Sequence, residues 1–200
     1  MRVGLFFLVG CTPDLATPDA ILEAQESELP EGTCDWLVPE NNWSIADPPC
    51  LEAEGFETGQ IVPDLRLMDQ NGDEVSLWQF YGDLIFLDFS AEWCAPCAHL
   101  AMGADELITA VEGEGVSMVS VMYNGDGSVP LDQDALLKWA QLGENVAPVL
   151  SDDGTWTDQV IPPGGAYPAL LLIDRDMRVL NDDIQPPEDY AVLLEIEDHL

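Results

Sequence analysis

Two cysteines separated by two residues, Cys94 and Cys97, close the segment "LDFSAEWCAPC" at residues 87–97. A pair with this spacing serves as a structural disulfide, as part of a metal site or as a redox centre, and the compartment helps to decide among these. An apolar run precedes the pair, and small, helix-compatible residues follow it. The pattern therefore predicts that Cys94 lies at the start of a helix that follows a buried strand.

This position would activate Cys94. Unpaired backbone N–H groups and the helix dipole favour negative charge at a helix start, and the thiolate is the nucleophilic form of cysteine. Such sites lower a thiol pKa from about 8.5 to roughly 3.5–7.5. Cys97 lies one turn further along, where we expect it to be buried and to resolve a mixed disulfide. Pro96 suits the first turn of the helix.

The first residues, "MRVGLFFLVGCTPD", have the order of a secretory signal: an arginine, a short apolar run and a small residue before Cys11. Residues 8–11 resemble the bacterial lipobox, which implies cleavage before Cys11 and lipidation of its thiol. A plain buried cysteine and a cleaved secretory signal are the alternatives. The lipobox interpretation predicts a signal peptide at 1–10 and an oxidising, extracytoplasmic address.

The chain has five cysteines, so lipidation of Cys11 would leave four. By position these form two pairs, Cys34 with Cys50 and Cys94 with Cys97. A Cys34–Cys50 disulfide would close a loop of about 17 residues, which contributes roughly 3 kcal/mol in the chain-entropy model; two free thiols are the alternative. The expected organisation is an acidic tether at 11–33, a disulfide-closed extension at 34–58 and the main domain at 59–200.

Acidic residues dominate the charge, with 39 Asp and Glu against 5 Lys and Arg and a formal net charge of −34 at pH 7. Binding to nucleic acid needs clustered cations, so this composition excludes it. The acids are scattered, which indicates a solvated acidic surface, and adaptation to a salty environment is an alternative explanation. We expect a monomer that meets the membrane only through its lipid anchor.

The main domain alternates strand and helix patterns. Alternation at 63–69 and 73–77, joined by a Gln-Asn-Gly turn, predicts a β-hairpin. Apolar runs at 83–89 and 116–123 predict two buried strands. The other expected elements are helices at 95–112, 131–143 and 186–200, a strand at 147–152, an irregular connection at 153–168 and two antiparallel strands within 169–181. This order implies an α/β fold with helices on both faces of a sheet.

The segment "LDFSAEWCAPC" resembles the signature of the thioredoxin superfamily. Residues 57–200 are similar to its redoxin branch, which includes the membrane-anchored thiol–disulfide oxidoreductases of the TlpA and ResA type. The resemblance implies a thioredoxin-like fold, a central mixed sheet flanked by helices, with an N-terminal β-hairpin extension. It also implies that Cys94 attacks and Cys97 resolves, that the redox-active disulfide is the only cofactor, and that no metal takes part.

The implied partners are the thiols and disulfides of exported proteins, together with a membrane or periplasmic electron donor. The implied location is the bacterial cell envelope, facing the periplasm and held by the lipid anchor. Two other functions remain open. Peroxiredoxins share the fold but place Thr and Pro before a lone cysteine, unlike "SAEWC" here. Sco-type copper chaperones normally have three residues between the two cysteines, together with a distant histidine. This chain has two residues between its cysteines, and its only histidines are His99 and His199.

Four more residues of this chain can each be matched to a position of the superfamily pattern. Asp88 lies inside an apolar run, where a carboxylate is costly unless its pKa rises. It matches the buried acid of thioredoxin, which implies that it takes the proton of Cys97. Pro168 matches the cis-proline that opens a strand beside the active site, and Tyr167 would present its backbone to a client. Trp93 matches the aromatic residue before the first cysteine, which shields the disulfide or packs in the core.

One position departs from the pattern. Many TlpA-type proteins carry an acidic residue shortly after the second cysteine, and this chain has His99 there. The histidine either tunes the thiolate or is an exposed helix residue without a role.

Overall fold

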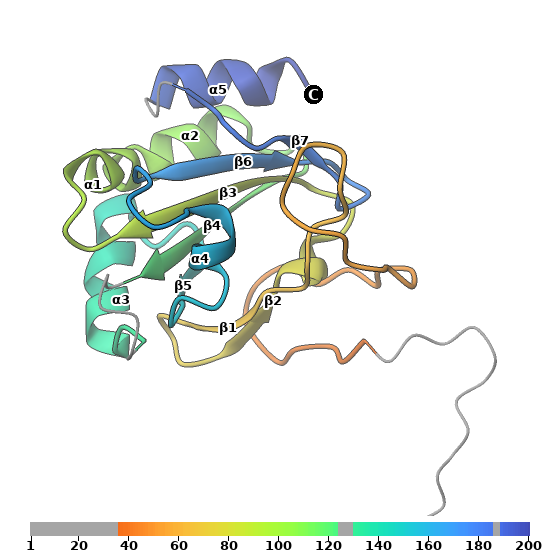
Figure 1. Ribbon diagram of the computed structural model, residues 1–200. Helices are drawn as coiled ribbons and strands as arrows, with labels where there is room; N and C mark the ends of the chain where they lie inside the picture. The colour runs from red at the N-terminus through yellow and green to blue at the C-terminus, as the bar shows by residue number, and fades with distance from the viewer. Residues whose placement is uncertain (1–35, 124–129, 186–188) are drawn as a thin grey trace, which may run out of the picture. The chain divides into compact units, whose positions relative to one another are not determined.

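A seven-stranded mixed sheet forms the centre of the protein in a computed structural model, which describes residues 36–123, 130–185 and 189–200 (Figure 1). The strand order is β2-β1-β5-β4-β3-β6-β7, with β3, β4 and β5 parallel and the other pairings antiparallel. The strands are β1 Arg66–Asp69, β2 Glu74–Ser76, β3 Leu84–Ala91, β4 Val116–Tyr123, β5 Val149–Ser151, β6 Ala169–Ile173 and β7 Val179–Asn181. The predicted mixed sheet and the β1–β2 hairpin are thus confirmed.

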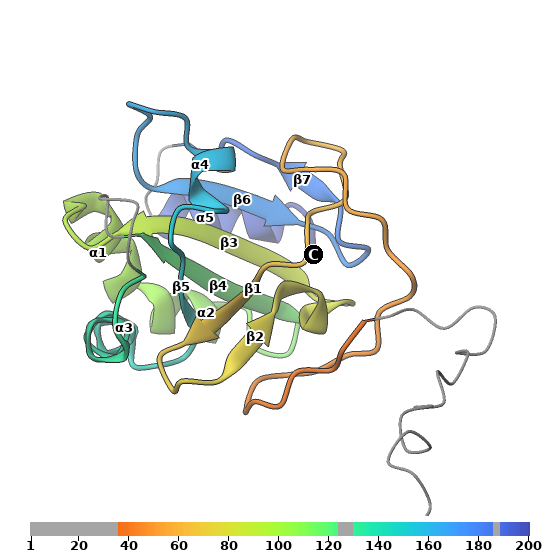
Figure 2. The ribbon, with the colours of Figure 1, turned by 60° about the horizontal axis from the view of Figure 1, so that its bottom comes forward.

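Helices cover the two faces of the sheet unequally. The elements are α1 Ala95–Met102, α2 Ala104–Ala110, α3 Gln133–Ala140, α4 Thr157–Val160 and α5 Asp189–Glu197, with 3₁₀ turns η2 Leu77–Phe80 and η3 Gln141–Gly143. The longer helices α1, α2, α3 and α5 share one face, and α4 lies on the other (Figure 2). Helices on both faces were predicted, but the second face carries only single turns and the N-terminal extension.

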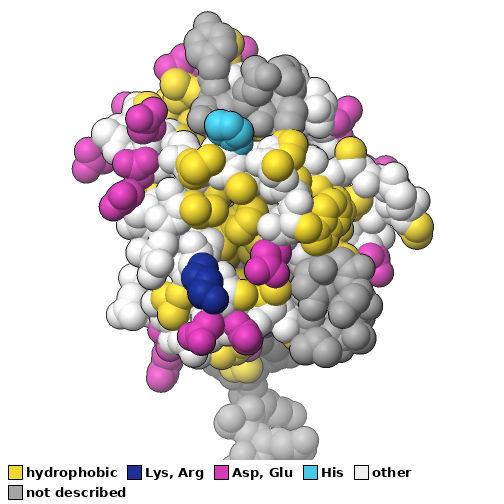
Figure 3. Space-filling model, turned by 90° about the vertical axis from the view of Figure 1, so that its left-hand side faces the viewer, with side chains coloured by type: hydrophobic (Ala, Val, Ile, Leu, Met, Phe, Trp, Pro, Cys, Tyr) yellow, Lys and Arg dark blue, Asp and Glu magenta, His cyan; other side chains and the backbone are white. Residues whose placement is uncertain are grey.

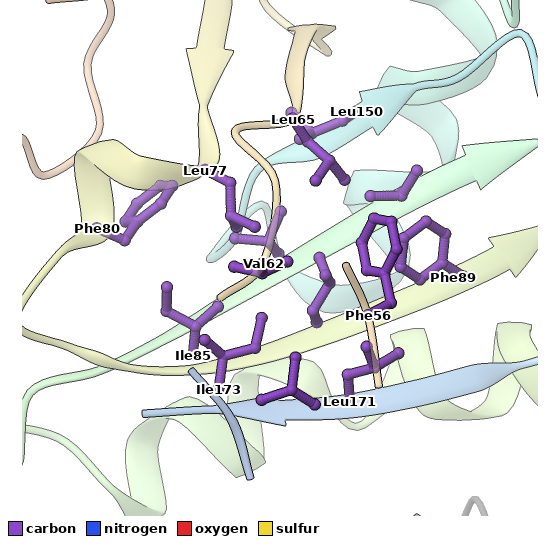
Figure 4. Packing of buried hydrophobic residues seen from close by; sticks show 14 of the residues in the cluster. Phe56, Val62, Leu65, Leu77, Phe80, Ile85, Phe89, Leu150, Leu171 and Ile173 are labelled. Carbon is purple, nitrogen blue, oxygen red and sulfur yellow. The ribbon is translucent and has the colours of Figure 1, made fainter. Parts of the chain in front are cut away.

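The core on this second face is built from alternate residues of the central strands, because successive side chains of a strand point to opposite faces. Ile85, Leu87 and Phe89 of β3 point there and are fully buried. Figure 4 shows Leu171 and Ile173 of the neighbouring strand β6 beside them, with Leu65 and Leu77 from the two ends of the hairpin in the same cluster. Phe56 of the extension packs edge-on against Phe89, with ring centroids 5.9 Å apart. The extension therefore contributes directly to the core.

Residues 36–58 also bind the hairpin through side-chain hydrogen bonds. Trp36 Nε1 donates to Ser76 Oγ at 3.1 Å, and Trp43 Nε1 donates to Asp69 Oδ2 at 2.7 Å. Cys50 is disulfide-bonded. Its predicted partner Cys34 lies outside the described residues, as do Cys11 and the expected signal peptide and tether, so these assignments stay predictions. Among the described residues, no helix combines the length and apolarity that crossing a membrane requires.

The prediction of one helix at 95–112 is wrong, because the chain forms α1 and α2 with a break at Gly103. The Gly103 amide donates to the Leu100 carbonyl oxygen at 3.1 Å, and its ψ angle is −2°. Glycine destabilises the interior of a helix by roughly 1 kcal/mol relative to alanine. Interrupting the helix at Gly103 therefore costs little. After the break, Ala104 and Leu107 pack into the core above the sheet.

The predicted irregular connection at 153–168 contains a helix, α4. The buried carboxylate of Asp152 accepts hydrogen bonds from Thr157 N at 2.7 Å and from Thr157 Oγ1 at 2.6 Å. These bonds satisfy donors at the start of the helix. Asp152 lies five residues before Thr157, whereas a usual N-cap side chain bonds an amide two or three residues later. For this reason the sequence pattern did not predict the helix.

Gly143 lets η3 approach the α1–α2 junction closely. A Cβ atom at this position would lie 2.6 Å from Ala101 O and 2.8 Å from Ala104 Cβ. We expect Gly143→Ala to lower the free energy of unfolding by about 1–3 kcal/mol in urea denaturation, because the packed backbone must move. The neighbouring Leu142→Ala is the control: Leu142 is partly exposed, and its loss should cost less than about 0.5 kcal/mol. Equal effects of the two substitutions would contradict this account.

Candidate active site

Cys94 and Cys97 form a disulfide at the N-terminus of α1, with an S–S distance of 2.06 Å. Cys94 is the N-cap residue, and its Sγ accepts a hydrogen bond from Cys97 N at 3.2 Å. Pro96 lies within the first turn, as predicted. Cys94 is 5% exposed and Cys97 is 0% exposed. A partner therefore reaches Cys94 first, and Cys97 is placed as the inner cysteine.

The buried strand β3 positions this pair. All eight residues of β3 are buried, which anchors the strand at the centre of the sheet. The Cys94 amide donates to the Ala91 carbonyl oxygen at 2.9 Å, so a tight turn connects the strand to α1. The sequence therefore holds the cysteines at the carboxyl edge of the parallel strands, where ligand and active sites of α/β sheets lie.

Asp88 is fully buried in β3, and three hydrogen bonds reach its carboxyl group. Ser90 Oγ lies 2.7 and 2.8 Å from the two carboxyl oxygens, and Ser120 Oγ of β4 lies 3.2 Å from Oδ2. Burial raises the pKa of Asp88 to about 7, and the hydrogen bonds from Ser90 and Ser120 oppose this rise. A carboxyl group with this pKa gains and loses a proton near neutral pH, which suits a general acid or base.

Asp88 and Cys97 lie on the same side of the sheet. The parallel register pairs Asp88 with Ser120, and Met122 follows two residues later on the same face of β4. Met122 belongs to the cluster that contains Cys97, and this face is the one that α1 covers. The structure thus places on one face of the sheet the two residues that the predicted proton transfer requires.

Pro168 lies beside the end of β3, directly before the neighbouring strand β6. The Tyr167–Pro168 peptide bond is cis, as the resemblance implied. The next residue, Ala169, pairs with Phe89 in the antiparallel β3–β6 register, which places Pro168 beside the last residues of β3. The cis-proline loop therefore borders the turn that carries Cys94.

Trp93 contacts Tyr167 rather than the core. Their rings meet edge-on with centroids 5.2 Å apart, and Trp93 is 63% exposed. The core alternative for Trp93 is therefore wrong, because the residue lies outside the buried strand on the turn. Burial raises the pKa of Tyr167 to about 12, and the nearby charges of Tyr123, Asp158 and Asp152 add to the effect. Its phenol is therefore neutral at physiological pH.

The surroundings of the disulfide are largely apolar. Figure 3 shows hydrophobic side chains gathered on the face that carries α1 and α3, with few charges among them. His99 of α1 is exposed. A hollow of about 230 Å³ lies beside the cis-proline loop, lined by Pro168, Ala169 and Asp182 among others. A hollow of about 480 Å³ beside β1 and α3 is lined by none of the predicted site residues.

Sequence reasoning missed the two serines that contact Asp88. Ser90 is two residues after Asp88, and strand alternation puts both side chains on one face, so this contact was open to prediction. Ser120 is 32 residues away, and only the register of β3 with β4 brings it to the carboxyl group.

Comparison with known proteins identifies the family. Residues 58–181 match the AhpC/TSA family. The chain belongs to this family. Over 135 residues it is 27% identical to the thiol-disulfide oxidoreductase ResA of Bacillus thuringiensis, a match that covers 64% of this chain and 70% of that protein. It is also 26% identical to the thioredoxin-like protein YneN of Bacillus subtilis over 139 residues, which covers 69% and 78%.

Solved structures show the same fold. A thiol:disulfide interchange protein DsbE from Chlorobium tepidum superimposes with a TM-score of 0.58 at 24% identity, covering 72% of this chain and 98% of that one. The thioredoxin domain of a thiol-disulfide oxidoreductase from Bacteroides vulgatus gives 0.57 at 16% identity, covering 72% and 97%. This AhpC/TSA family member thus has the predicted thioredoxin-like fold. It is a thiol–disulfide oxidoreductase of the TlpA/ResA type.

Proposed function

We propose that this oxidoreductase exchanges disulfides with exported proteins, held on the periplasmic side of the cell envelope by a lipid on Cys11. The observation that carries the exchange is the Cys94–Cys97 disulfide at the start of α1, bordered by the Pro168 loop. The lipobox-like residues 8–11 support the anchor. The disulfide at Cys50 supports the location, because disulfides persist in oxidising compartments.

In the reduced protein, the Cys94 thiolate attacks a client disulfide. A bond forms between Cys94 Sγ and one client sulfur, and the other client sulfur leaves as a thiolate. The helix start stabilises the thiolate of Cys94, and Cys97 N is placed to donate to its sulfur. The apolar surface around the cysteines suits a client segment that lies across them. The product of this step is a mixed disulfide.

Cys97 then resolves the mixed disulfide. Asp88, as carboxylate, takes the Cys97 proton, and the Cys97 thiolate attacks Cys94 Sγ. The second client sulfur leaves as a thiolate, the protein becomes the Cys94–Cys97 disulfide, and the client has gained two electrons. A membrane or periplasmic thiol donor returns the pair to the dithiol form. With a reduced client the same steps run in reverse, and the reduction potential of the pair sets the direction.

The test is the equilibrium redox potential of Cys94–Cys97 in dithiol buffers of graded potential, followed by thiol trapping and mass spectrometry. We expect one reversible two-electron couple, in which a tenfold change in the ratio of forms corresponds to about 30 mV. Cys94→Ser is the control and should show no couple. A pair that cannot be oxidised and reduced reversibly would contradict this proposal. So would a pair that is protected from thiol trapping only when copper is present, and either result would favour the copper-chaperone alternative. Fast peroxide consumption would favour the thiol peroxidase.

A further inference from the structure

Trp139 carries a buried donor that the proposed mechanism does not use. The side chain is 7% exposed, and its Nε1–H has no hydrogen-bond partner among the described residues. A buried N–H without a partner costs about 1–3 kcal/mol, so native proteins normally satisfy such groups with protein atoms or with water. Trp78 follows this rule, because its Nε1–H donates to Val62 O at 2.9 Å.

A small cavity connects Trp139 with the Asp88 site. Its volume is about 20 Å³, and its lining includes Trp139, Ser120 and Ala101. A cavity of roughly 10–15 Å³ on this measure holds one water molecule. Ser120 is 3% exposed, whereas Val146, also in the lining, is 37% exposed. The cavity therefore extends from Ser120, which bonds Asp88, to Val146 in the segment that follows η3.

We propose that one water molecule occupies this cavity, accepts the Trp139 Nε1–H, bonds Ser120 Oγ, and connects the carboxyl group of Asp88 with solvent. Trp139 is then a positioning residue, because it holds the water and never exchanges its own proton in the cycle. The proposal rests on the proposed function of Asp88 as acceptor of the Cys97 proton.

The relay balances in protons. When protonated Asp88 returns its proton, the carboxyl O–H donates to Ser120 Oγ, and the Ser120 hydroxyl passes its own proton to the water. The water releases a proton to solvent, and Asp88 is again a carboxylate. Ser120 and the water molecule each end with the same number of hydrogens that they had at the start.

Few other groups influence Asp88. Ser90 of the same strand and Ser120 of β4 both donate hydrogen bonds to its carboxyl group. The Cys94–Cys97 pair lies on the same side of the sheet, which α1 covers. His99 of α1 and Lys138 of α3 are both exposed, and neither contributes to the pKa of Asp88. A change in that pKa after substitution at Trp139 would therefore report the water.

The first measurement is NMR of the oxidised full chain, in which no turnover is needed. We expect a cross-peak between the Trp139 indole N–H and water, assigned by its loss in Trp139→Phe. The same substitution should raise the pKa of Asp88, read from its side-chain carboxyl signal, by roughly 0.5, because a water-mediated bond that supports the carboxylate is lost. Trp78→Phe is the matched control and should leave this pKa unchanged.

Substitution of the serine separates the relay from packing. Ser120→Ala should raise the pKa of Asp88 and shift the pH profile of thiol–disulfide exchange with it, whereas Ser120→Thr, which keeps the hydroxyl group, should restore both. A missing water cross-peak together with an unchanged pKa in Trp139→Phe would overturn the proposal. So would a bound water combined with a normal pH profile in Ser120→Ala. Failure of the proposed function would be seen separately, as a cysteine pair that does not cycle.

Discussion

Replacing Cys97 by alanine is expected to trap client proteins on Cys94 as stable mixed disulfides. Cys94 is bonded to the buried Cys97, so without Cys97 the second displacement loses the nucleophile that the described part of the chain places beside Cys94. Attack by Cys94 remains possible, because its position at the start of α1 does not depend on the Cys97 side chain. Turnover should fall by roughly three orders of magnitude or more, as when other enzymes lose a member of the catalytic unit.

The experiment is to incubate Cys97→Ala with envelope extracts, block free thiols, and identify cross-linked partners by mass spectrometry with and without reductant. The double variant Cys94→Ser with Cys97→Ala is the control and should trap no partner. Cross-links that persist in the double variant would come from another cysteine. Full turnover in Cys97→Ala would show that Cys97 is not the resolving residue.

Replacing Asp88 by asparagine should stabilise the protein at neutral pH while it slows exchange. The pKa of Asp88 is about 7 in the folded protein, against 3.8 for an ordinary carboxyl group. The folded state therefore holds a proton that the unfolded state has lost, and stability falls as pH rises between about 4 and 7. Each unit of pKa corresponds to 1.36 kcal/mol, so the loss above pH 7 is roughly 4 kcal/mol.

Asparagine does not titrate, so Asp88→Asn should avoid this loss. We expect the free energy of unfolding of the oxidised variant, relative to the native chain, to rise from near zero at pH 4 to as much as about 4 kcal/mol at pH 8. Urea denaturation at several pH values measures this difference. Glu106→Gln is the control, since it removes an exposed carboxylate of an already acidic protein and should show no such pH dependence.

The same variant tests the proton transfer. Without the carboxylate, the Cys97 proton has no general base, and exchange should slow by about 10²-fold, the lower end of what such bases contribute. A rate that equals that of the native chain between pH 6 and 8 would remove Asp88 from the mechanism. A stability difference that does not vary with pH would contradict the raised pKa.

Local residue patterns were enough to predict the cysteine pair at a helix start and most of the elements that carry it. The apolar run at 83–89 predicted β3, and β4 has the predicted bounds, Val116–Tyr123. These predictions succeeded because a fully buried strand and a helix start depend on local residue types. The resemblance added Asp88 and the cis peptide bond before Pro168, which no local pattern predicts.

The surroundings of these residues depend on how distant segments of the chain pack together. Ser120 reaches Asp88 through the register of two parallel strands, which depends on a crossover of many residues rather than on neighbours in sequence. The break at Gly103 and the close approach of Gly143 follow from packing on the sheet. Trp139 acquires its unpaired donor beside the Ser120 cavity for the same reason, since burial and cavities arise when separate elements meet.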